Sequence, residues 1–207
     1  MPGALMSASD PDARDPRDEE LKALVVAGEL ERATEGAIRL YGPELVGWLC
    51  SVLPSEADAQ DAFSRTSLEL WKSLRRFDGR CSIRTWCYML ARHAAVKVRA
   101  KKSQEVLVSQ LPSIVGAVSH VWSTTRHKQA EVADVYTQIR NELDEEDQIL
   151  LVLRVDKDLA WKDIAQVLLG EEAPPDELQR KAAALRKQFE RVKERLKVLA
   201  AERLAKA

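Results

Sequence analysis

Apolar residues recur at helical spacing through most of this chain, and this periodicity restricts the possible fold more than any other feature. Between residues 83 and 102 the apolar positions fall three or four residues apart, at Ile83, Trp86, Cys87, Leu90, Ala94 and Val98. Such spacing places side chains on one face of an α-helix. The chain also has five tryptophans but only eight glycines, fewer than the turns of an all-β fold usually need. The sequence therefore predicts an all-α protein.

Helix-breaking residues divide the periodic stretches into separate helices. In the first part we expect a helix over 21–41 that weakens at Gly28, stops at Gly42-Pro43 and resumes up to Leu53 before Pro54. Further helices are expected over 57–74, 83–102, 127–143, 144–155, 161–169 and from about 176 toward the C-terminus. Ser82 is placed to cap the helix over 83–102, because its hydroxyl can accept hydrogen bonds from the unpaired first amides.

Composition divides the chain into four parts. Residues 1–17 mix Asp, Pro, Ala and Arg without periodicity, which predicts a disordered acidic leader. Residues 103–126 are rich in Ser and Thr and lack a clean period, which predicts a linker, too polar to cross a membrane. The apolar residues within it indicate that it packs either on this chain or on a partner. The fold class is thus two small helical domains, 18–102 and 127–207, joined by that linker.

Positive charge is concentrated in one segment, although the net charge of the chain is only -1. Residues 75–102 hold nine Lys and Arg residues and one acidic residue, Asp78, which is the density that a nucleic-acid backbone attracts. The helix over 83–102 places Arg84, Tyr88, Arg92, Arg99 and Lys102 opposite its apolar face. The loop before it combines cations, an aromatic residue and a glycine, as a pocket for an unstacked base needs. A solvated basic face and an ordinary turn are the alternatives.

Residues 58–102, DAQDAFSRTSLELWKSLRRFDGRCSIRTWCYMLARHAAVKVRAKK, resemble region two of the sigma-70 family, and the chain looks like a group-four (extracytoplasmic-function, ECF) member. The resemblance rests on the D-A-x-D opening, the aromatic residue before the basic loop and the S-x-R-T-W helix start. It implies that the D-A-x-D helix binds the RNA polymerase clamp through Asp58 and Asp61. It also implies minus-ten promoter contacts by Arg76, Phe77, Asp78, Gly79, Arg80, Ser82, Arg84, Tyr88, Arg92, Arg99 and Lys102. Trp86 is expected in the core, and His93 is assigned no function.

Residues 143–170, LDEEDQILLVLRVDKDLAWKDIAQVLLG, resemble the first half of sigma region four, a helix-turn-helix. Ala160 stands where the family usually has a Ser or Thr cap, and we expect Asp158 to substitute in part. Residues 170–179 lengthen the usual turn, and Pro174 and Pro175 suit a helix start. The resemblance implies that Lys181, Arg186 and Lys187 read the minus-thirty-five element, with a register that the longer turn leaves open.

The last helix carries a regular apolar row at Leu178, Ala182, Leu185, Phe189, Val192, Leu196 and Leu199. A dimerisation helix is the alternative explanation of this row. The resemblance implies core RNA polymerase and promoter DNA as partners, with an anti-sigma factor as a possible third. The sequence has no motif of an enzyme, a cofactor site or a metal site, and its three unpaired cysteines and polar start predict a cytoplasmic protein. A stand-alone helix-turn-helix regulator and a helical interaction protein that never touches DNA remain as alternatives.

Overall fold

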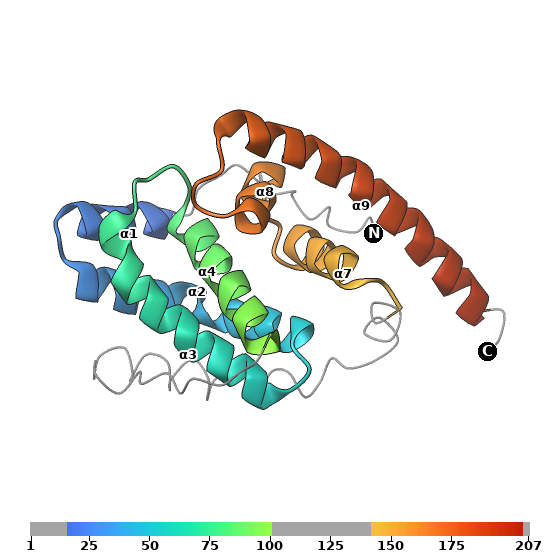
Figure 1. Ribbon diagram of the computed structural model, residues 1–207, viewed down its shortest axis with the longest axis horizontal. Coiled ribbons are helices and arrows are strands. Elements are labelled where there is room, and N and C mark those ends of the chain that lie inside the picture. The colour runs from blue at the N-terminus through green and yellow to red at the C-terminus, as the bar shows by residue number, and fades with distance from the viewer. Residues whose placement is uncertain (1–15, 101–141, 205–207) are drawn as a thin grey trace, which may run out of the picture.

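The computed structural model describes residues 16–100, here called the N-terminal half, and residues 142–204, here called the C-terminal half (Figure 1). Both halves consist of helices, turns and loops, and no strand occurs in these two ranges. The helices are α1 (Pro16–Val26), α2 (Leu30–Val52), α3 (Glu56–Ser73), η1 (Leu74–Arg76), α4 (Ile83–Arg99), α7 (Glu145–Leu151), the π-helical η3 (Val152–Asp156), α8 (Trp161–Leu169) and α9 (Pro175–Leu204). The all-α prediction is confirmed. The predicted leader up to residue 15, the predicted linker, Lys102 and nearly all of the helix expected over 127–143 lie outside the described ranges.

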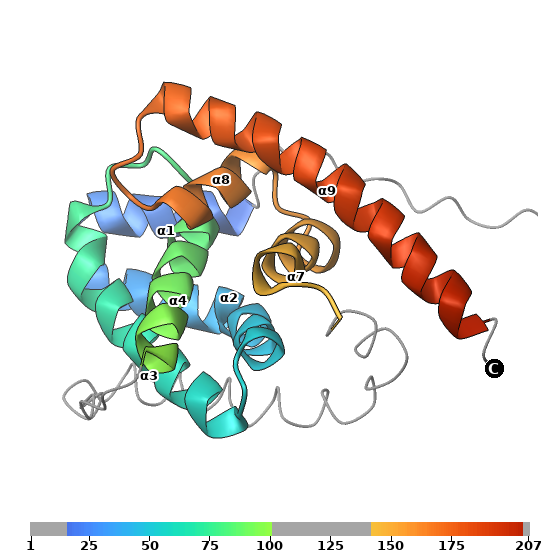
Figure 2. The same cartoon turned by 45° about the vertical axis from the view of Figure 1, so that its right-hand side comes forward.

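Helix α4 is the centre of the N-terminal half, where it packs against α1, α2 and α3 (Figure 2). Its apolar face is buried as predicted, apart from the half-buried Leu90. Trp86 is a core residue, and its indole Nε1 donates a hydrogen bond to Ser73 Oγ at 3.1 Å. This bond satisfies the one polar group that Trp86 brings into the core.

Helix α2 is continuous through Pro43, so the break predicted at Gly42-Pro43 is wrong. A proline inside a helix removes one backbone hydrogen bond and crowds the preceding turn. Here Tyr41 and Leu45, on either side of the proline, are both buried in the core, and that burial outweighs the local cost. At Gly28, where only a weakening was expected, the helix breaks fully, and Gly28 has a φ of 77° between α1 and α2. The break expected before Pro54 is confirmed, since α2 ends at Val52.

In the C-terminal half, α9 lies across α7 and α8 and extends beyond them (Figure 2). The helix begins at Pro175, as its proline pair predicts, and the apolar row faces inward, with Leu178, Ala182, Leu185 and Val192 buried. Helix α8 begins at Trp161, and its N-cap residue, Ala160, provides no side-chain cap. The expected substitute, Asp158, adopts a φ of 47° and forms an ion pair with Arg154 at 3.3 Å, so the expectation that it caps α8 is wrong.

The two halves pack against each other, with α4 against α8 and α2 against α7. One hydrophobic cluster runs through both, from Trp48 and Phe63 in the N-terminal half to Leu153, Ile164 and Leu185 in the C-terminal half. The division into two separately packed domains therefore stays a prediction. None of the helices in the described ranges is long and apolar enough to cross a membrane.

Candidate nucleic-acid interface

The N-terminus of α4 is fixed by two side chains. Ser82 Oγ accepts a hydrogen bond from the Thr85 amide at 2.9 Å, which confirms the predicted cap. The other two unpaired amides, those of Ile83 and Arg84, donate to the carboxylate of Asp18 in α1 at 3.2 and 3.1 Å. These three first-turn amides of α4 are thus satisfied. The loop that precedes α4 therefore ends at a fixed point.

Asp18 is only 1% exposed, and its carboxylate is surrounded by donors. Besides the two amides, Tyr41 Oη donates to Oδ1 at 2.8 Å, and Lys22 Nζ lies 3.3 Å from Oδ2. A carboxylate at a helix N-terminus is favoured by the helix dipole as well as by these bonds. Asp18 therefore joins α1, α2 and α4 at one point.

The loop between η1 and α4 consists mostly of exposed residues, and one aromatic residue attaches it to the core. Arg76, Asp78, Gly79 and Arg80 are exposed. Phe77 is half-buried, with its ring edge-on to Trp86 at a centroid separation of 5.4 Å. Gly79 has a φ of 77°, a backbone conformation that favours glycine, and open space surrounds it on the side where another residue would carry its Cβ. The loop thus presents exposed cations beside an aromatic ring that packs against the core.

Arg84, the first member of the predicted cationic row, is tied down by ion pairing. Its Nε and Nη2 each lie 2.8 Å from a carboxylate oxygen of Glu44 in α2. Burial disfavours the charged guanidinium, but the hydrogen bond and the charge of Glu44 outweigh it and raise the pKa of Arg84. Arg84 Nη2 also donates to the carbonyl oxygen of Lys157, at 2.7 Å, in the C-terminal half.

Tyr88 is fully buried, so its predicted place on an exposed face is wrong. Its ring packs edge-on against Trp48 at 5.8 Å, with the Arg84 guanidinium 5.9 Å from the ring centroid. Burial and the nearby charge of Glu44 raise the pKa of Tyr88. Helical spacing does place Tyr88 on the same face as Arg84, but this face lies against α2 rather than solvent.

Arg92 and Arg99, further along α4, also point toward other parts of the protein. Arg92 is half-buried, and its Nε has no hydrogen-bond partner in the described part of the chain. Arg99 donates to the carbonyl oxygen of Val52 and forms an ion pair with Glu145 of α7, and burial lowers its pKa. The structure thus gathers Arg84, Arg92 and Arg99 on one side of α4, as predicted, and covers part of that side, since Arg84 and Arg92 are half-buried and Arg99 is exposed.

The two residues predicted to bind polymerase lie on the first two turns of α3. Asp58 accepts a hydrogen bond from Ser55 Oγ at 2.7 Å, and Asp61 forms an ion pair with Arg65 at 3.0 Å. Both are half-buried. They are three residues apart and so lie on the same side of the helix, where a partner can reach both.

The three predicted minus-thirty-five residues differ in exposure. Arg186 and Lys187 are exposed on α9. Lys181 is half-buried and lines a cavity between the halves. In this arrangement only Arg186 and Lys187 lie on an open surface.

Three residues that position the site were missed from the sequence. Asp18 was placed at the start of the first domain but given no role, Glu44 was not singled out, and Lys157 contributes a backbone carbonyl. Asp18 and Glu44 lie 66 and 40 residues from Arg84, so helical spacing carries no signal of either contact. The only local hint was an acidic residue in the first turn of α1.

The segment that contains the loop and α4 matches a known protein family. Residues 37–105 match the family model of sigma-70 region 2. The matched segment contains α3, the exposed loop and α4, and it covers about a third of the chain. No curated protein and no solved structure matched the chain significantly. The match supports a sigma factor of the sigma-70 family, with its region 2 in residues 37–105.

Proposed function

We propose that the chain is an ECF-type (group-four) sigma factor that directs core RNA polymerase to the promoters of one regulon. Helix α3 binds the polymerase clamp through Asp58 and Asp61, and the loop before α4 recognises and opens the minus-ten element. Helix α9 contacts the minus-thirty-five element, and an anti-sigma factor is a possible further partner. Such a protein acts in the cytoplasm and catalyses no reaction itself.

The observation that carries this proposal is the coincidence of the region 2 match with an exposed basic loop. The match spans residues 37–105, and within it Arg76 and Arg80 are exposed on either side of the half-buried Phe77. An aromatic ring beside cations offers an unstacked base both a stacking surface and hydrogen-bond donors. The cations of the same loop can also neutralise the phosphates next to that base.

Reconstitution with core polymerase tests the proposal. The purified chain should co-elute with core polymerase and start transcripts at discrete sites on fragmented genomic DNA, which sequencing of the transcripts would map. Asp61→Lys should weaken the complex at least about tenfold, since a rim charge that meets a partner of opposite sign affects association strongly. Glu69→Lys is the matched control, because Glu69 is also an acidic residue of α3 paired with a nearby cation, Lys72 at 3.8 Å.

Two results would contradict the proposal. One is a wild-type chain that forms no complex with core polymerase, and the other is equal weakening by Asp61→Lys and Glu69→Lys. In the reconstituted complex, Arg76→Glu with Arg80→Glu should abolish promoter opening while polymerase binding persists. Arg32→Glu, at an exposed position of α2, should leave opening unchanged.

A stand-alone regulator that dimerises through α9 finds less support. Leu178, Ala182, Leu185 and Val192 of the apolar row are buried against the chain's own helices. A row that is already covered has little apolar surface left for a second copy. Sizing of the purified chain and a gel shift without polymerase distinguish the two functions, because only the regulator should form a dimer that binds DNA specifically unaided.

A further inference from the structure

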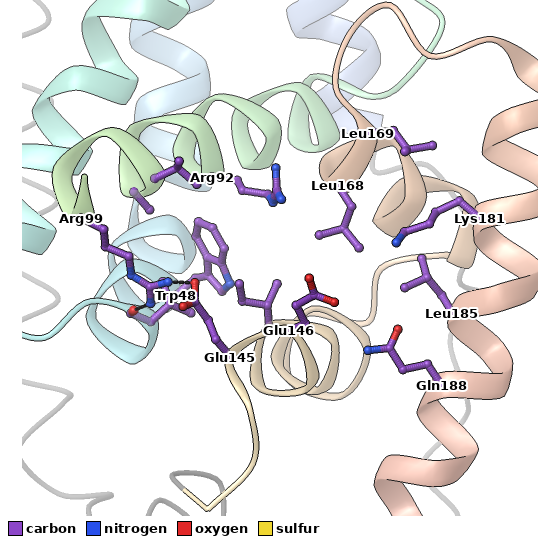
Figure 3. A pocket seen from close by; sticks show the side chains of 14 residues that line it. Trp48, Arg92, Arg99, Glu145, Glu146, Leu168, Leu169, Lys181, Leu185 and Gln188 are labelled. Carbon is purple, nitrogen blue, oxygen red and sulfur yellow. Dashed lines mark hydrogen bonds and ion pairs between the residues drawn. The ribbon is translucent and has the colours of Figure 1, made fainter. Parts of the chain in front are cut away.

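A cavity of about 310 Å³ lies between the two halves, where α2 and α4 face α7, α8 and α9 (Figure 3). Pockets that hold small organic molecules are usually of about 300–1,000 Å³, whereas close packing leaves few voids of this size inside a folded protein. Binding of polymerase and promoter DNA gives this cavity no role. Its volume is sufficient for a small organic ligand.

One part of the cavity wall is aliphatic. The aliphatic lining residues that are buried or half-buried come from five helices: Val52, Ala95, Ile149, Leu168, Leu169 and Leu185. An apolar group placed against them is removed from water, which favours its binding. Val96, Glu145 and Glu146 also line the cavity but are exposed, so a ligand can enter from solvent beside them.

Two side chains of the wall carry a buried hydrogen-bond donor that has no acceptor within residues 16–100 and 142–204: Trp48 Nε1 and Arg92 Nε. Trp48 is only 1% exposed. Figure 3 shows both side chains reaching toward the cavity, with the indole nitrogen of Trp48 on the side that faces it. Buried donors in folded proteins are nearly always paired, and an unpaired one is destabilising. A ligand oxygen in the cavity would give these donors an acceptor.

The charges around the cavity favour an anion. Arg99 forms an ion pair with Glu145, so these two charges largely balance each other. Of the other charged lining residues, Arg92 and Lys181 are half-buried, while Glu146 is exposed. In Figure 3 the Lys181 side chain extends from α9 toward the same space as Arg92. Water and salt screen an exposed charge more than a half-buried one, so the two cations outweigh the single carboxylate.

We propose that this cavity is a binding site for a small monocarboxylate with an apolar body. The carboxylate accepts hydrogen bonds from Trp48 Nε1 and from Arg92, and it lies near the ammonium group of Lys181. The apolar body packs against the aliphatic side chains of the wall. Hydrogen bonds to a charged donor are the stronger ones, so Arg92 contributes most to recognition. The site goes beyond the proposed function and does not depend on it.

Isothermal titration calorimetry of the full chain tests the site with octanoate, octylamine, 1-octanol and inorganic phosphate as probes. Octanoate has the expected charge on an aliphatic chain. Octylamine and 1-octanol carry the same chain with a positive charge or with none, and phosphate is an anion without an apolar body. We expect one octanoate to bind per chain, at least about tenfold more tightly than each of the other probes, because only octanoate satisfies both the donors and the aliphatic wall.

Variants of the charged residues test which side chains hold the carboxylate. Arg92→Gln should weaken octanoate binding about tenfold or more, and Lys181→Gln about threefold or more, since each removes a half-buried cation. Lys197→Gln is the matched control for Lys181→Gln, because Lys197 is an exposed lysine of the same helix. Glu146→Gln should strengthen octanoate binding about twofold by removing an exposed like charge, whereas damage to the fold would weaken it.

Four results would overturn the proposal. The wild type binds no octanoate; octylamine or 1-octanol binds as tightly as octanoate; phosphate binds as tightly as octanoate, which would indicate an anion site without recognition of the apolar body; or Lys181→Gln and Lys197→Gln have equal effects. The comparison of probes uses the wild-type chain alone, so it decides the question even if Arg92→Gln does not fold. No measurement involves polymerase or DNA, so failure of this site would leave the proposed function intact.

Discussion

Replacing Asp18 tests whether a residue at the start of α1 holds the N-terminus of α4. Its carboxylate accepts hydrogen bonds from Tyr41 Oη and from the amides of Ile83 and Arg84, and it lies 3.3 Å from Lys22 Nζ. Asp18→Ala removes all four interactions at once. The Tyr41 hydroxyl and the Ile83 amide then remain buried without their acceptor, while the Arg84 amide, which is partly buried, is closer to water.

The magnitude follows from these contacts. Each buried donor that loses its partner costs about 1–3 kcal/mol, and the loss of a helix cap costs about 1 kcal/mol. Since these losses overlap at the two amides, we expect Asp18→Ala to lower the free energy of unfolding by about 3 kcal/mol. With a urea dependence of about 2 kcal/mol/M, the unfolding midpoint should fall by about 1.5 M. Asp18→Asn, which keeps one acceptor oxygen, should fall between Asp18→Ala and the wild type.

Urea unfolding followed by far-ultraviolet circular dichroism measures the effect. Glu19→Ala is the control, since Glu19 is the next residue, is acidic and also pairs with Lys22, but its side chain is 54% exposed. An exposed ion pair of this kind contributes less than about 1 kcal/mol. If Asp18→Ala and Glu19→Ala destabilise the protein equally, the anchoring role of Asp18 is refuted.

Three further predictions concern the same region. Ser82→Ala should lower the free energy of unfolding by about 1 kcal/mol through loss of the cap on Thr85, and equal stability in urea would contradict this. Alkylation of native protein by iodoacetamide at pH 8, followed by mass spectrometry, should spare Cys81 and Cys87, because burial raises the pKa of Cys81 to about 12 and that of Cys87 well above its usual value; rapid labelling would show that these thiols are accessible. The pKa of His93 should lie below 6.5, owing first to burial and then to the nearby cations. The folded state then favours neutral His93, so the protein should lose stability as the pH falls from 6.5 toward the lowered pKa. Over this pH range the urea midpoint should fall less in His93→Asn than in the wild type. An equal fall in both proteins would contradict the prediction.

The local rules of helix formation account for what was predicted correctly. The apolar face of α4, the Ser82 cap, the Pro175 start of α9 and the inward-facing row of α9 all depend on residues within a few positions of one another. Helical spacing and capping are properties of such short segments. Local sequence therefore identified the helices, and the charge pattern identified the candidate DNA surface.

Interactions between distant segments account for what was missed. Helix α2 continues through Pro43 because residues on both sides of it are buried by other helices. Tyr88 is buried although its neighbours on α4 are charged, because Trp48 of α2 occupies that side. A helical projection shows which residues share a face but not what that face meets.

The sequence by itself determined an all-α chain with a basic helix, a basic loop before it and a long apolar-faced helix near its C-terminus. Tertiary structure alone decided that Asp18 anchors α4, that Glu44 pairs with Arg84 and that the C-terminal half contacts the cationic side of α4. The physical reason is the range of the forces involved. Helical periodicity and caps act over one or two turns, whereas ion pairs and packing join residues that only the folded chain brings together.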